Sequence, residues 1–235
     1  MSVKSVRWLV AETLVVVLGI LIALGLDDYR TGINERRLAI EYVERIQDDV
    51  DRDLRYLAAV WNPRIKLKRE SLESIAPVIR GQSPVPTDSV AFLKSVSLGG
   101  VIGTTAAAWY TDTTFQDMRA TGNLRLIQDA AVRAEIAEYY EMLESEALRL
   151  ERRFTNYVPF VHSVMPSELR EDIDSESLEK FGTDYALERL LSDEFRELLN
   201  QEYNLMLFME RVEVEEFARS LYDELESYRI SLESR

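Results

Sequence analysis

The sequence has no cysteine, a single histidine, six prolines and nine glycines in 235 residues. Without cysteine the chain forms no disulfide, uses no thiol nucleophile and offers no thiolate to zinc or to an iron–sulfur cluster. The scarcity of glycine and proline argues against a sandwich of many short strands joined by tight turns. A net charge of −14 opposes binding to nucleic-acid phosphates, so we expect no nucleic-acid partner.

The motifs of common catalytic and cofactor sites are also missing. His162 is the only histidine and lies in an apolar break between helices, which is typical of a structural residue. One histidine cannot supply the two Glu-x-x-His motifs of a di-iron bundle, and neither a phosphate-binding glycine loop nor a nucleophile elbow occurs. We therefore predict no catalytic residue, no cofactor and no metal site, and a protein that is not an enzyme.

One long apolar run is present, from Trp8 to Leu26, about 28 Å long if helical and close to the thickness of a bilayer core. A cleaved signal peptide and a buried core helix are the two alternatives to a membrane anchor. We favour the anchor because the run is long for a signal peptide and has no polar face after Leu14. The predicted organisation is a short cytoplasmic tail over residues 1–7, a transmembrane helix over 8–26, and a helical soluble domain over 27–235.

The predicted span contains one acidic residue and two small residues with specific expectations. Glu12 either faces a partner helix or a water-filled path, or extends its carboxylate to the headgroups near Lys4 and Arg7. Gly19 and Ala23 are four residues apart, a spacing that permits close contact between membrane helices. The basic residues before the span favour a cytoplasmic N-terminus, with the soluble domain outside the cytoplasm.

Beyond the apolar run, stripes of apolar residues at 3–4 spacing predict an all-α fold, in which the membrane helix continues into a soluble bundle of three or four long helices. We expect Asn62-Pro63 to end the first helix. Thr114 opens a helix that Gly122 should end in a left-handed turn. The other helices are predicted over residues 64–80, 87–96, 128–157 and 184–232.

Two patches resemble an uncharacterised family of bacterial single-pass membrane proteins. The first is the anchor, in which Glu12 precedes the stretch Gly-Ile-Leu-Ile-Ala-Leu at residues 19–24. The second is Thr-Gly-Asn-Leu-Arg-Leu-Ile at 121–127, which leads into the pair Tyr139-Tyr140. The resemblance implies a location in the bacterial inner membrane and a helical fold, and it brings no known activity.

Some polar and aromatic residues are assigned from their pattern alone. Trp109 and Tyr110, beside a segment rich in glycine, threonine and alanine, are candidates for lining a pocket, with ordinary packing as the alternative. Two charged clusters are each expected on a solvated helix face. They are the acidic group Asp48, Asp49, Asp51 and Asp53, and the basic group Arg64, Lys66, Lys68 and Arg69.

The sequence favours a membrane-anchored helical scaffold or accessory protein over a catalyst. Its partners would be the lipid bilayer and either further copies of the chain or another membrane protein. One alternative is an extracytoplasmic domain that binds or senses a ligand near Trp109 and Tyr110. A second alternative is an ion- or proton-conducting oligomer that uses Glu12.

Overall fold

The computed structural model describes residues 3–87, 89–100, 110–151, 155–165, 183–209 and 212–234. Within these ranges the regular elements are all helices, which confirms the all-α prediction. The elements are α1 (Val3–Tyr56), η1 (Leu57–Trp61), α2 (Asn62–Ile79), α3 (Ser89–Gly99), α4 (Thr113–Thr121), η2 (Asn123–Leu126), α5 (Ala130–Glu151), α6 (Tyr157–Val164), α8 (Thr183–Leu190), α9 (Asp193–Leu207) and α10 (Val212–Glu233).

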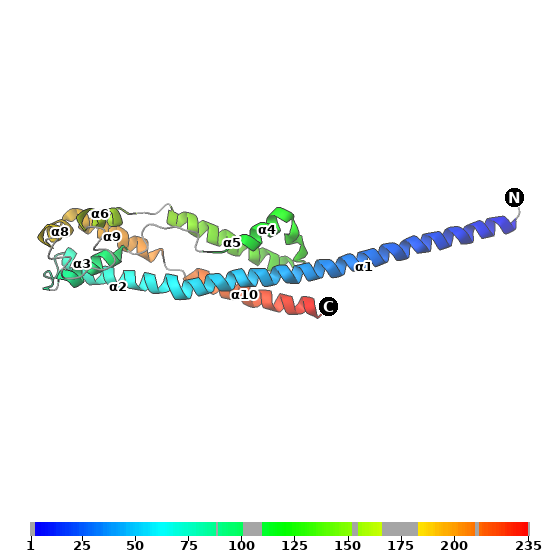
Figure 1. Ribbon diagram of the computed structural model, residues 1–235, viewed down its shortest axis with the longest axis horizontal. Helices are drawn as coiled ribbons and strands as arrows, with labels where there is room; N and C mark the ends of the chain where they lie inside the picture. The colour runs from blue at the N-terminus through cyan, green and yellow to red at the C-terminus, as the bar shows by residue number, and fades with distance from the viewer. Residues whose placement is uncertain are drawn as a thin grey trace.

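One continuous helical segment forms the long axis of the molecule (Figure 1). The π-helical turn η1 joins α1 directly to α2, so the prediction that Asn62-Pro63 ends the helix is wrong. Proline lacks an N–H, and its ring clashes with the carbonyl four residues earlier in a regular helix. The backbone N–H of Asn62 instead donates to the carbonyl of Leu57, and this wider turn makes room for the ring of Pro63.

Two hydrophobic cores follow one another along this axis. The central core gathers apolar side chains from α1, α4, α5 and α10, including Val43, Ile136 and Leu221. The end core gathers those of α2, α3, α6, α8 and α9, including Leu72 and Phe195. The body is therefore two helical clusters in series (Figure 1) rather than one bundle of three or four long helices.

The predicted last helix over residues 184–232 is divided into α8, α9 and α10. Ser192 separates the first two, because its side chain accepts a hydrogen bond from the N–H of Phe195 (3.2 Å) and caps α9. A turn at Phe208 and Met209 ends α9. The indole of Trp61 in η1 donates to the carbonyl of Met209 (2.9 Å), so the wide turn and this break contact each other, and both residues belong to the central core.

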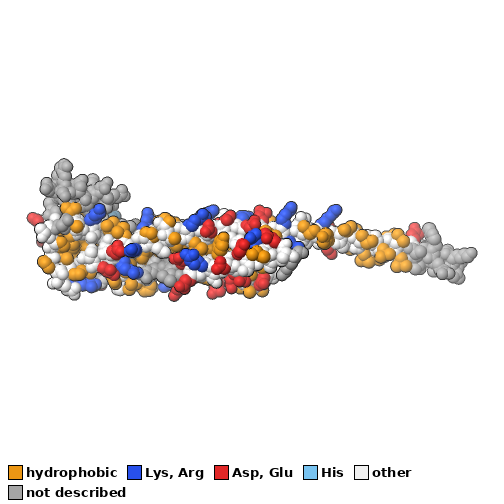
Figure 2. Space-filling model, turned by 90° about the horizontal axis from the view of Figure 1, so that it is seen from below, with side chains coloured by type: hydrophobic (Ala, Val, Ile, Leu, Met, Phe, Trp, Pro, Cys, Tyr) orange, Lys and Arg blue, Asp and Glu red, His pale blue; other side chains and the backbone are white. Residues whose placement is uncertain are grey.

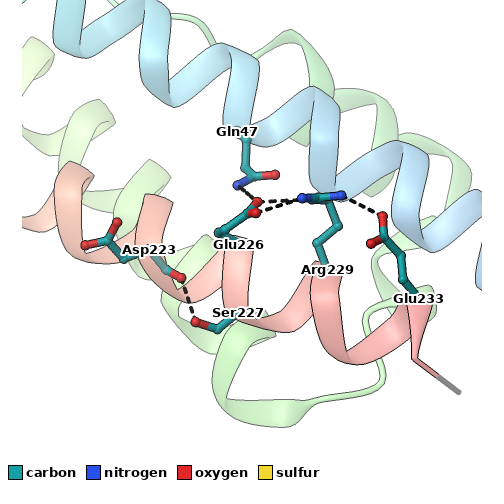
Figure 3. Close-up of polar contacts among 6 residues, drawn as sticks. All are labelled: Gln47, Asp223, Glu226, Ser227, Arg229 and Glu233. Atoms are coloured by element: carbon teal, nitrogen blue, oxygen red, sulfur yellow. Dashed lines mark hydrogen bonds and ion pairs between the residues drawn. The ribbon is translucent and has the colours of Figure 1, made fainter.

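α10 lies antiparallel beside α1, and a polar network on α10 is joined to α1 by a hydrogen bond from Gln47 (Figure 3). Gln47 of α1 donates to Glu226 (3.2 Å), while Arg229 donates to both oxygens of Glu226 (2.7 and 3.0 Å) and to Glu233 (2.6 Å). The hydrogen bonds from Arg229 and Gln47 hold the pKa of Glu226 below its usual value. The ion pairs of Arg229 with Glu226 and Glu233 are partly exposed, so they add little to stability.

Candidate functional site

The N-terminal part of α1 projects from the body (Figure 1), and Figure 2 shows apolar side chains along the face of this helix that it presents. Among the described side chains of this helix, Ala39 is the first that is buried, and those from Leu14 to Asn34 are all exposed. The large apolar ones among them are between 45% and 70% exposed up to Leu26. Water disfavours an apolar surface of this extent, so another apolar phase or partner is expected to cover it.

Among the helices that the structure describes, none combines the length and the apolarity that crossing a bilayer requires. The transmembrane helix predicted over residues 8–26 is therefore not confirmed. The side chains of residues 8–11 and 13 of that prediction lie outside the described residues. The described apolar surface, residues 14–26, is about 20 Å long, shorter than a bilayer core of about 30 Å.

The residues singled out in the apolar run all lie on the projecting part of α1. Glu12 is exposed, as are Gly19 and Ala23. A Cβ atom added at Gly19 would meet nothing within 4 Å. The single chain thus leaves the small-residue face uncovered, and the predicted roles of these three residues stay predictions.

Two acidic residues of α1 form a buried polar cluster in the central core. Asp53 accepts hydrogen bonds from the backbone N–H of Thr111 (2.9 Å) and from the hydroxyl of Tyr139 (3.1 Å). Asp49 accepts from the N–H of Thr114 (3.3 Å) in the first turn of α4, where helical N–H groups lack partners of their own. The solvated face predicted for the acidic cluster is therefore wrong for Asp49 and Asp53, which are 5% and 1% exposed.

The position of Asp53 gives the folded state a sensitivity to pH. Burial raises the pKa of Asp53 to about 6; the charge of Asp49 adds to this effect, and the hydrogen bonds from Tyr139 and Thr111 oppose it. The folded chain thus binds this proton more tightly than the unfolded chain, whose aspartates titrate near 3.8. The stability that Asp53 contributes is complete at pH values below 3.8 and is lost as the pH rises through about 6.

Asp53→Asn is expected to gain stability relative to the original chain as pH rises. Because the amide carries no charge at any pH, the difference in unfolding free energy should shift by about 2 kcal/mol in favour of the variant between pH 4 and pH 7.5. Urea unfolding followed by circular dichroism at several pH values measures the shift. Asp51→Asn, at a half-buried position of the same helix, is the control and should not reproduce it. A pH-independent difference would contradict the assignment.

The end core contains a buried ion pair that the sequence reading missed. The ammonium of Lys68 in α2 donates to Glu202 in α9, and the hydroxyl of Thr155 donates to the other oxygen of the same carboxylate. Both charged side chains are fully buried. Burial lowers the pKa of Lys68, while the charge and hydrogen bond of Glu202 oppose that shift.

The solvated helix face that the sequence predicts for the basic run of α2 is therefore wrong for Lys68, which is fully buried. Lys68 lies on the apolar stripe that also contains Ile65, Leu72 and Ile75, and all three of those residues are buried. A charged residue on a stripe of helical spacing was the available signal. A second one, Glu202 among Leu198, Leu199 and Leu205 of α9, supplies its partner.

Tyr110, one of the two predicted pocket residues, does line a cleft, and Trp109 lies outside the described residues. The cleft has a volume of about 370 Å³ and runs between α4 and α5. His162 is exposed in α6. No group of three or more histidine, aspartate or glutamate side chains is placed to hold a metal ion in the described ranges.

Comparison with known proteins identifies no relative. No family model, no curated protein and no solved structure matches the chain. The resemblance to bacterial single-pass membrane proteins accordingly rests on the residues of its two patches alone and stays a prediction.

Proposed function

We propose that the protein is a membrane-anchored helical scaffold or accessory protein that acts by self-association or by binding another membrane protein. The observation that carries the proposal is the apolar surface of the projecting helix, which is exposed on every side from Leu14 to Leu26. Full burial of one such aliphatic side chain is worth about 1.5–3 kcal/mol. Covering the whole run is therefore strongly favourable.

A lipid phase fits this surface better than one partner helix would. A partner helix covers a single stripe and leaves the opposite side in water, whereas the apolar side chains here surround the helix axis. Asp27, Asp28 and Arg30 follow the run directly, and such charged residues belong at a membrane–water boundary. We place the anchor in a bacterial inner membrane, with the N-terminus cytoplasmic and the body outside the cytoplasm.

The body would then stand away from the membrane on a stiff support. α1 continues from the apolar run to Tyr56 without interruption, and η1 carries the helix on into the end core. From Asp27 to Trp61 this helix is about 50 Å long. A scaffold needs such a fixed separation between its anchor and its distal surface, and the absence of a recognised catalytic motif is consistent with that role.

Self-association is expected to use the face that bears Gly19 and Ala23. Close helix contact requires small residues, so Gly19→Leu/Ala23→Leu should shift the full-length protein, extracted in mild detergent, from a multimer to a monomer. Native mass spectrometry measures this directly. Gly25→Leu is the matched control: Gly25 is equally open and lies on the opposite side of the helix. A monomeric original protein would contradict self-association.

A further inference from the structure

The cleft between α4 and α5 has the size and lining of a small-ligand site. Its volume of about 370 Å³ falls within the range of known ligand pockets. Phe115 of α4 and Tyr140 of α5 stack in its wall with ring centroids 4.4 Å apart and planes 8° apart. Phe115 and Tyr140 are 6% and 4% exposed, so this wall presents little more than the edges of the two rings to the cleft.

A polar group in this wall lacks a partner. The hydroxyl of Tyr140 is buried and has no hydrogen-bond partner among the described residues, and the side chain as a whole is only 4% exposed. Tyr139, the preceding residue, donates a hydrogen bond from its hydroxyl to Asp53, so the two tyrosines differ in this respect. A buried hydroxyl without a partner is unfavourable, and a ligand that hydrogen-bonds to it would remove that cost.

The electrostatic field in the cleft is negative. Asp112, Glu141 and Glu144 line it against a single cation, Arg119. The guanidinium of Arg119 lies over the Phe115 ring, 5.6 Å from its centroid, and neither glutamate forms an ion pair among the described residues. Besides burial, the charges of Asp112 and Glu144 raise the pKa of Tyr110, as expected where negative charge dominates.

We propose that this cleft binds a small organic ammonium ion, a primary amine with an apolar body. The ammonium group lies against the carboxylates and donates a hydrogen bond to the hydroxyl oxygen of Tyr140. The apolar body packs against Leu124 and Ala137, which line the cleft and are partly exposed. The hydroxyl of Tyr140 is closed to water in this structure, so its hydrogen bond to the ligand requires the side chains around it to rearrange. The site is independent of the proposed anchoring.

Phenethylamine, titrated calorimetrically into the full-length protein in mild detergent, tests the proposal. We expect saturable binding, with phenethyl alcohol, its neutral counterpart, at least tenfold weaker because it lacks the charge. Tyr140→Phe should weaken binding of the amine about tenfold, the value of a hydrogen bond to a charged group. Glu144→Gln should weaken it several-fold, whereas Glu138→Gln, exposed on α5 outside the cleft, should change nothing.

Thermal unfolding separates a lost contact from a damaged fold. Because the hydroxyl of Tyr140 has no partner to lose, Tyr140→Phe should unfold at the same or a higher temperature than the original protein. No saturable binding of phenethylamine would overturn the proposal. Equal affinity for the alcohol, or unchanged affinity in a folded Tyr140→Phe variant, would overturn it as well.

Discussion

Glu202→Gln should lower the free energy of unfolding by about 3–5 kcal/mol, the largest single-residue effect that we expect in the body. The substitution preserves the size of the side chain and removes its charge. Lys68 then lies fully buried without a counterion. An ammonium without a counterion in an apolar core has a high desolvation cost, which a hydrogen bond to the neutral amide oxygen offsets only in part and which loss of its proton would remove. Urea unfolding at pH 7 measures the effect.

The same variant should also change its response to pH. With Glu202 neutral, the pKa of Lys68, already lowered by burial, falls further because the attraction that opposed the shift is gone. The folded variant then binds this proton less tightly than the unfolded chain does, so its stability rises with pH. Urea midpoints between pH 7 and pH 9.5 should therefore increase in the variant more than in the original protein.

Lys68→Met/Glu202→Leu is the matched control. Replacing both charges with apolar groups of similar volume removes the desolvation cost on both sides, and such double changes are often neutral or stabilising. The double variant should recover most of the lost stability, although Thr155 loses its acceptor. A double variant as unstable as Glu202→Gln would show that shape, rather than the uncompensated charge, dominates at this position.

Leu18→Arg/Leu21→Arg should release the protein from membranes, the second large effect. An arginine near the middle of a membrane helix costs about 2.5–3.5 kcal/mol, so two of them cost roughly 5 kcal/mol or more. This cost exceeds the free energy of membrane insertion that several aliphatic residues together contribute. After cell lysis, the original protein should resist alkaline carbonate extraction and remain in the membrane pellet, while the variant should appear in the supernatant.

Leu207→Arg controls for a general effect of added charge. Leu207 lies in the body at the end of α9. It is 53% exposed, a fraction similar to that of Leu18 and Leu21 in α1. We expect this variant to remain in the membrane fraction. An original protein that carbonate extracts completely would contradict the anchor, as would full retention of the double-arginine variant.

Local sequence signals predicted many of the helices because their physical causes are local. Gly122, with φ of 72°, ends α4 in the left-handed conformation expected of it. The uninterrupted helix from the apolar run through residues 43–57 also follows from its 3–4 spacing. Ser192 followed by two acidic residues is a recognisable helix start, and reading it would have divided the predicted last helix.

The errors lie where tertiary contacts override local preference. A proline such as Pro63 normally ends a regular helix. Here the helix continues because the π-helical turn η1, where Trp61 contacts Met209, is wide enough for the proline ring. The sequences of α1 and α2 alone predict that Asp53 and Lys68 are solvated. Both are buried because a residue of another helix, Tyr139 or Glu202, supplies a polar partner. The cleft needs α4 and α5 side by side, so the sequence suggested Tyr110 without indicating Tyr140 or Glu144.

Because α1 is one continuous helix, the rotation of the body about the helix axis is fixed relative to the faces of the apolar run. Each residue of an α-helix turns the chain by about 100°. The number of residues between Ala23 and Ala39 therefore determines which side of the body lies above the face that bears Gly19 and Ala23. In a symmetric assembly built on the small-residue face, all cleft mouths would point in the same angular direction relative to the symmetry axis. Helical phase alone would then decide whether the clefts face the lumen of the assembly or its periphery.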